Sequence, residues 1–109
     1  MTPLTPAVLH VLLALAGGKL HGYAIAKEVA RQTDSQVRMG PGTLYGTLQR
    51  LLNQGWIAVS ETPGEVDERR RYYRLTGLGK RALEEEVQRM DALVRTARAA
   101  RISPRPSKP

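Results

Sequence analysis

The first helix that the sequence predicts is apolar on two sides, and this feature constrains the fold more than any other. Thr5 suits the N-cap, Pro6 suits the first helical position, and Gly17-Gly18 predict the helix end. The two apolar stripes are Leu4, Val8, Val11, Leu12 and Leu15, and then Leu9, Leu13 and Ala16. Such a helix needs two burial surfaces, and a single small domain supplies one. We therefore expect a second copy of the chain to cover part of this helix.

Local patterns predict two further helices, a hairpin and a long last helix. The expected ranges are about 23–32 and 41–54 for the helices, 56–62 and 71–75 for the strands, and 77–100 for the last helix. His21 is expected to cap the second helix and Thr76 the last one. This order is that of a winged helix-turn-helix with an extra C-terminal helix, which is a mainly α fold with a small β-hairpin.

Composition narrows the classes of function. The 109 residues include no cysteine, which excludes disulfides and thiolate metal sites and suits a reducing, cytoplasmic setting. The apolar stretch from Leu4 to Ala16 is too short to span a bilayer, so we expect no membrane partner. The formal net charge is +7, which makes nucleic acid the first candidate partner. Ordinary basic solubility is the alternative explanation of this charge.

The sequence gives little support for a catalytic site or a metal site. His10 and His21 have no third ligand at helical or loop spacing, so no metal site and no cofactor are expected. The carboxylates of residues 84–86 are interpreted as acids that favour the positive end of the last helix. No nucleophile with a neighbouring base and no glycine-rich phosphate loop stands out. The chain is therefore not expected to be an enzyme.

The third predicted helix has one apolar face and one face of hydrogen-bonding side chains. The apolar face consists of Leu44, Leu48, Leu51 and Leu52, and the opposite face consists of Thr43, Tyr45, Gly46, Gln49, Arg50 and Asn53. Glutamine, asparagine and arginine can read base edges, and a mid-helix glycine, which costs about 1 kcal/mol, would let DNA approach the backbone. A solvated face with a tolerated glycine is the alternative. The absence of acidic residues from 39 to 60 favours DNA.

Two further sets of basic residues are candidates for contacts with phosphates. Arg69, Arg70 and Arg71 lie, with Arg74, at the predicted wing, although the acids of residues 65–68 partly cancel their field. Lys27, together with Lys19, is a candidate for further backbone contacts. A solvated hairpin tip is the alternative for the wing.

The last predicted helix carries a short coiled-coil seam. Its apolar residues are spaced 4, 3, 4 and 3, and they are Leu83, Val87, Met90, Val94 and Ala97, with Leu93 widening the stripe. About two heptads would hardly hold a dimer alone, so Val8 and Leu12 of the first helix are expected to contribute. We therefore expect a homodimer. The predicted division is a DNA-binding domain over 1–76, a dimerisation helix over 77–101 and a disordered basic tail over 102–109.

The chain resembles the PadR family of winged-helix transcriptional regulators, in the branch with a single short C-terminal helix. The matching segments are LHGY at 20–23, PGTLY at 41–45, Leu48, Leu51, GWI at 55–57 and RRRYYRLTGLGKRAL at 69–83. The resemblance implies a homodimeric repressor of palindromic promoter DNA that is often released by a small-molecule effector. It also implies that the third helix enters the major groove, that the wing touches the flanking backbone, and that the last helix packs against the partner's first helix.

The chain departs from the pattern of the family at one point. Some relatives hold flat aromatic effectors between aromatic side chains, and the last helix here carries none; Leu83, Met90 and Leu93 could instead line a pocket for a small apolar effector. The sequence thus predicts a sequence-specific DNA-binding repressor. The alternative is a winged-helix module for protein interaction without DNA, which an apolar outer face on the third helix would favour.

Overall fold

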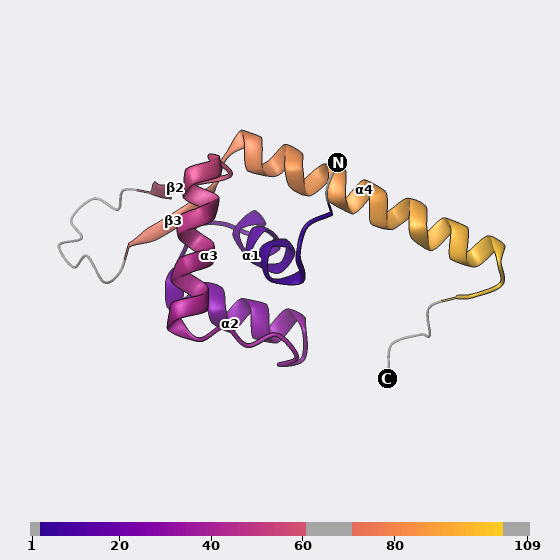
Figure 1. Cartoon of the computed structure of the whole chain (residues 1–109), viewed down its shortest axis with the longest axis horizontal. Coiled ribbons are helices and arrows are strands. Elements are labelled where there is room, and N and C mark those ends of the chain that lie inside the picture. The colour runs from indigo at the N-terminus through magenta and orange to yellow at the C-terminus, as the bar shows by residue number, and fades with distance from the viewer. Residues whose placement is uncertain (1–2, 61–70, 104–109) are drawn as a thin grey trace.

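The computed structural model describes residues 3–60 and 71–103. In chain order the elements are α1 (Pro6–Ala16), β1 (Leu20–His21), α2 (Gly22–Gln32), α3 (Pro41–Gln54), β2 (Ile57–Ser60), β3 (Tyr72–Leu75) and α4 (Gly77–Ala99). The first three helices and the sheet form one body, and α4 crosses the body beside α1 and then runs beyond it (Figure 1). The predicted winged helix-turn-helix with an added C-terminal helix is confirmed.

The sheet has three strands where two were predicted. β3 lies between the other strands and pairs antiparallel with both, with Leu20 opposite Tyr73 and Ile57 opposite Leu75. β1 leaves no signal in the sequence because two residues are too few to show alternation. β2 and β3 each begin one residue later than expected. The predicted hairpin tip and the end of the tail, at 61–70 and 104–109, lie outside the described residues.

The predicted helix caps are confirmed. The Thr5 hydroxyl accepts a hydrogen bond from the Val8 N–H at 3.3 Å, and the Thr76 hydroxyl accepts one from the Gly79 N–H at 3.0 Å. His21 caps α2 through Nδ1, which accepts from the Ala24 N–H at 3.2 Å. These local bonds satisfy backbone donors that the first turn of a helix leaves without partners.

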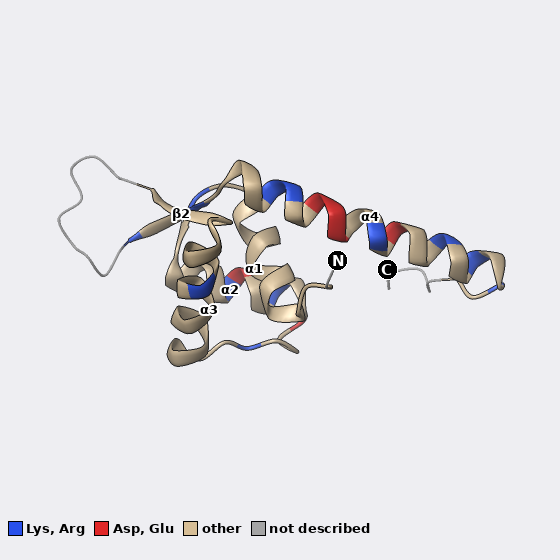
Figure 2. Ribbon diagram, turned by 45° about the horizontal axis from the view of Figure 1, so that its top comes forward, with Lys and Arg blue, Asp and Glu red and all other residues tan. Residues whose placement is uncertain are grey.

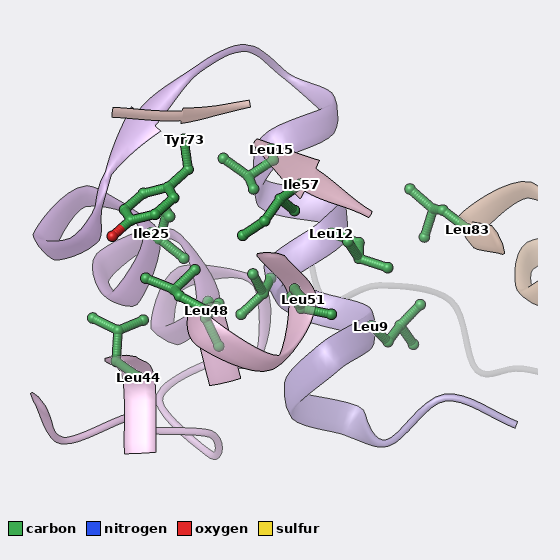
Figure 3. Packing of buried hydrophobic residues seen from close by; sticks show 12 residues of the cluster. Leu9, Leu12, Leu15, Ile25, Leu44, Leu48, Leu51, Ile57, Tyr73 and Leu83 are labelled. Carbon is green, nitrogen blue, oxygen red and sulfur yellow. The ribbon is translucent and has the colours of Figure 1, made fainter. Parts of the chain in front are cut away.

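The core lies between α1, α2, α3 and the inner face of the sheet, and α4 closes one side of it (Figure 3). Its buried residues are Leu9, Val11, Leu12, Leu15, Ile25, Val29, Leu44, Leu48, Leu51, Ile57, Tyr73 and Leu83. Leu9 of the second apolar stripe of α1 shares this core with Leu83 of α4. The chain itself therefore covers more of α1 than the sequence predicts, because α4 folds back across it.

The start of α4 is bound to the junction between α3 and β2. A Cβ atom at Gly79 would overlap the carbonyl oxygen of Trp56, so only glycine allows this approach. Thr76 adds two hydrogen bonds, since its N–H donates to the same carbonyl at 3.1 Å and its hydroxyl donates to the Gly55 carbonyl at 2.6 Å. These contacts fix where α4 leaves the body.

Glu86 forms a second tie between α4 and the rest of the chain. Its carboxylate is buried and accepts hydrogen bonds from the Leu4 N–H at 3.2 Å and from the Arg89 guanidinium at 2.9 and 3.0 Å. The hydrogen bonds from Arg89 hold the pKa of Glu86 below its ordinary value. The interpretation of residues 84–86 as acids that favour the positive end of the helix does not account for Glu86, which is buried and bonded to Leu4, and no acid lies in the first turn of α4.

We predict that Glu86→Gln destabilises the fold in a pH-dependent way. Because the pKa of Glu86 is lowered in the folded protein, its stabilising contribution is complete above the ordinary value of 4.5 and is lost as the pH falls through the lower folded value. The variant should unfold at lower urea than the wild type at neutral pH, and the difference should shrink in acid. Glu84→Gln, at an exposed site, is the control and should change little; a pH-independent difference for Glu86→Gln would contradict this role.

Candidate nucleic-acid interface

α3 is held against the body by one face and leaves the other open. Its buried side chains are Leu44, Thr47, Leu48 and Leu51, with Leu52 half-buried. The four leucines were predicted, and Thr47 was missed. Its buried hydroxyl accepts a hydrogen bond from Arg50 Nη2 at 3.4 Å, which places the arginine stem along the helix.

The opposite face of α3 brings together the six residues predicted for DNA binding. Thr43, Tyr45, Gly46, Gln49, Arg50 and Asn53 are all exposed. Gln49 Nε2 donates to Asn53 Oδ1 at 3.1 Å, so these two amides form a hydrogen-bonded pair on the surface. The helix carries one basic residue and no acidic one (Figure 2). This face can therefore meet an anionic partner without repulsion from a carboxylate of its own helix.

Gly46 has no packing role within the protomer. A Cβ atom at this position would meet no atom within 4 Å, and the same holds for Gly42 one turn earlier. Alanine would fit and would favour the helix by about 1 kcal/mol. The exposed backbone at Gly46 therefore has no packing explanation within the described part of this chain.

Tyr45 takes a position that the sequence did not reveal. A Cβ atom at Gly22 would lie 2.8 Å from the Tyr45 hydroxyl oxygen, so the tyrosine reaches across to the start of α2. The ring is still 49% exposed. The glycine of LHGY and the tyrosine of PGTLY are thus neighbours, and their contact joins α2 to the outer face of α3.

The predicted basic contacts lie on other elements beside α3. Arg71, just before β3, and Arg74, within β3, are both exposed. Arg69 and Arg70 lie outside the described residues. Lys27 is exposed on α2, with its ammonium 5.3 Å from the centroid of the Tyr23 ring.

The seam on α4 is largely uncovered in the protomer. Val87, Met90, Leu93 and Val94 are exposed and Ala97 is half-buried. The later part of α4 runs beyond the body (Figure 1). Val8 is half-buried. Leu12 and Leu83, also predicted for the dimer, are core residues of the same chain, with 0% and 6% exposure. Because both side chains are buried, they could support a dimer interface only through the residues that cover them.

A hollow of about 550 Å³ lies at the root of α4. Its apolar wall includes Leu15, Leu75, Leu83 and Val87. Its charged rim consists of three basic residues, Lys19, Arg74 and Lys80, and one acidic residue, Glu84. Of the three residues predicted to line an apolar pocket, only Leu83 does so. Met90 and Leu93 lie farther along α4, where the hollow has ended.

The two histidines have structural partners. His10 Nδ1 lies 2.9 Å from Gln32 Oε1, and His21 caps α2. Over residues 3–60 and 71–103, no three metal-ligating side chains gather at one place. Within the same ranges, no helix has both the length and the apolar character needed to cross a membrane.

Comparisons with known proteins agree on one family. Residues 8–85 match the Transcriptional regulator PadR-like family. The transcriptional regulator Rv3488 of Mycobacterium tuberculosis is 38% identical over 87 residues, which are 80% of this chain and 78% of that protein. An uncharacterized 37.1 kDa protein of transposon TN4556 from Streptomyces fradiae is 43% identical over 83 residues, which are 76% of this chain and 22% of that protein.

Solved structures give the same fold. Bacillus subtilis PadR, in complex with operator DNA, superposes with a TM-score of 0.66 at 23% identity, over 80% of this chain and 49% of that one. The family consists of transcriptional regulators and not of enzymes, in agreement with the sequence analysis. This chain, with its open α3 face and added α4, belongs to the PadR-like family of transcriptional regulators.

Proposed function

We propose that this protein is a sequence-specific DNA-binding repressor that acts as a homodimer on a palindromic operator in the cytoplasm. The observation that carries the proposal is the outer face of α3, where amides and a guanidinium surround bare backbone at Gly46. Gln49, Arg50 and Asn53 offer the donors and acceptors that distinguish base pairs in the major groove. The family assignment and the fold shared with DNA-bound Bacillus subtilis PadR support this choice.

Contacts with phosphates would position α3 on the duplex. Thr43 and Tyr45 are suited to hydrogen bonds with phosphates of the DNA strand that borders the major groove. The arginines at the wing are suited to phosphates of the flanking DNA backbone, and they are Arg69, Arg70, Arg71 and Arg74. Such contacts bind every sequence alike. Specificity in this proposal therefore rests on three side chains of α3, and affinity rests largely on the basic residues around them.

The exposed seam of α4 supports dimerisation. Leu93 is 63% exposed and Val87 is 46% exposed, which is unfavourable for apolar side chains along a helix that projects into solvent. A two-fold arrangement would cover both copies of the seam, with Val8 at its edge. It would also present two α3 helices to half-sites about one helical turn, or a multiple, apart.

The hollow at the root of α4 suits a small effector. Its apolar wall would bind an apolar molecule, and the rim of Lys19, Arg74 and Lys80 would favour one that carries negative charge. Thr76 binds α4 to the carbonyl of Gly55, which ends α3. A ligand that shifted the start of α4 would therefore act directly on the end of α3, and release from the operator would follow.

A protein-interaction module without DNA is the alternative, and the polar outer face of α3 disfavours it. Binding assays with the DNA upstream of the protein's own gene separate the two. Sequence-dependent binding that weakens steeply with salt is expected for a regulator that contacts phosphates. Equal binding to unrelated duplexes, or no binding, would contradict the proposal.

Gly46→Ala should make the protein more stable and its DNA binding weaker. Alanine gains about 1 kcal/mol of helix propensity and meets no atom of the protomer, but its methyl group would stand between the helix and the duplex. Thermal unfolding and fluorescence anisotropy measure the two effects. Gly77→Ala, at another open helical glycine, is the control and should leave DNA binding unchanged. Undiminished binding by Gly46→Ala would rule out close backbone approach.

Arg50→Ala and Arg71→Ala should impair DNA binding in different ways. Removal of Arg50 should reduce the preference for operator over random duplex, since a good contact with a base contributes about 1–3 kcal/mol of discrimination. Removal of Arg71 should weaken binding to both duplexes by a similar factor. Competition binding at fixed salt gives both ratios. The same pattern of impairment in the two variants would refute the division of roles.

Leu93→Glu should convert the dimer to a monomer. A carboxylate in the centre of the seam would be buried without a partner in each protomer. Light scattering after size-exclusion chromatography measures the mass. Gln88→Glu adds the same charge at an exposed position outside the seam and should remain dimeric. A dimeric Leu93→Glu variant would place the interface elsewhere.

A further inference from the structure

Charged side chains border the apolar seam of α4 along one edge. Glu84, Asp91 and Arg98 recur every seven residues, and each directly follows an apolar residue of the seam. Seven residues are almost two helical turns, so the three side chains lie on one line beside the seam. All three are exposed. This line, which we call the charged edge, begins with two acids and ends with an arginine, and Figure 2 shows that the end of α4 carries basic residues without acidic ones.

Asp91 has a partner within the helix, whereas the two ends of the charged edge have none among the described residues. The Asp91 carboxylate lies 3.0 Å from the Arg95 guanidinium. In the described part of the chain, no ion pair includes Glu84 or Arg98. These two residues lie about four turns, or about 21 Å, apart on one helix, so they cannot pair with each other within the protomer. Their opposite charges are therefore available to a second helix.

An antiparallel second copy of α4 would bring these charges together. The midpoint between Glu84 and Arg98 is Asp91, so a two-fold axis beside this residue places each glutamate near the partner's Arg98. The two copies of Asp91 would meet near the axis, and the ion pair of each with Arg95 reduces their repulsion. In a parallel pair, by contrast, the glutamate and the partner's Arg98 would remain about 21 Å apart.

The apolar seam has nearly the same centre as the charges. The midpoint between Val87 and Ala97 is Ala92, one residue from the centre of the charged edge. An antiparallel pair about this point places Val87 opposite the partner's Ala97. It likewise places Met90 opposite the partner's Val94. One arrangement therefore covers the exposed apolar residues and pairs the opposite charges at the same time.

We infer that Glu84 and Arg98 select the partner of this chain. They form two symmetric ion pairs between antiparallel α4 helices, and they favour a second copy over a helix with a different pattern of charge. This inference rests on the proposed dimer and adds to it an orientation, a register and a source of specificity. Charges beside an apolar seam determine orientation and partner choice in coiled coils. Because an exposed ion pair contributes little to folding, the effect is expected in the affinity of the dimer and not in the stability of the protomer.

Charge reversal tests the two ion pairs. Glu84→Arg and Arg98→Glu should each weaken the dimer about ten-fold in sedimentation equilibrium, since each replaces two attractions by two repulsions. An equimolar mixture of these variants should form mixed dimers more tightly than either variant pairs with itself, because both contacts are attractive in the mixed dimer. Glu85→Arg makes the same change at an exposed residue on the opposite side of the helix from the seam, and it should keep the wild-type affinity.

Single cysteines test the orientation, because the chain has no cysteine of its own. In an oxidised mixture, chains with Val87→Cys should form a disulfide with chains that carry Ala97→Cys, and neither variant should cross-link to itself. Electrophoresis without reductant measures both products. Cross-linking of the Val87→Cys variant to itself would indicate a parallel pair and would overturn the inference.

The outcomes separate this inference from the proposed function. A monomeric wild type would contradict the proposed dimer, and this inference would fail with it. A dimeric wild type whose affinity is unchanged by both charge reversals would retain the dimer and exclude the ion pairs. Equal weakening by Glu85→Arg would mean that net charge, and not pairing, determines the affinity, which also overturns the inference. Because residues 84, 85 and 98 are exposed, these variants should fold normally, which circular dichroism verifies.

Discussion

The close contact between Gly79 and the backbone of Trp56 determines how the two parts of the protomer are joined. Because a side chain at residue 79 would overlap the Trp56 carbonyl, α4 can approach this junction only through glycine. Thr76, which caps α4, also donates hydrogen bonds to the carbonyls of Gly55 and Trp56. The end of α3, the start of β2 and the start of α4 thus meet at one place. The directions of the open α3 face and of the α4 seam depend on it.

Glu86 attaches α4 to the rest of the chain at a second place. A helix attached only at its first turn could swing, but the bond from the Leu4 N–H to Glu86 attaches α4 again farther along its length. A buried carboxylate is unfavourable unless it is paired, so the N-terminal segment and Arg89 must both remain in place. With two attachments, a displacement of α4 would shift the start of α1 and the end of α3 together.

The sequence predicted what depends on local bonds and failed where distant segments meet. The caps at Thr5, His21 and Thr76 and the leucine face of α3 follow from spacing along one helix, and they are confirmed. β1 is recognisable only through its pairing with β3. The burial of Leu12 and of Glu86 depends on contacts between segments that lie far apart in the sequence. The DNA-contact and dimer residues have their expected exposure in most cases, and their roles remain predictions.

α3 can present bare backbone because other parts of the fold stabilise it. Gly42 and Gly46 lower helix propensity on the exposed side, and the Gln49–Asn53 hydrogen bond there offsets only part of this cost. The compensation comes from the buried face, from the left-handed end at Gly55 and from the Thr76 bond behind it. Because these stabilising contacts all lie away from the open face, the side chains of that face are not needed to pack α3 against the body. The contacts that stabilise α3 and the polar side chains of its open face thus lie largely on opposite sides of one helix.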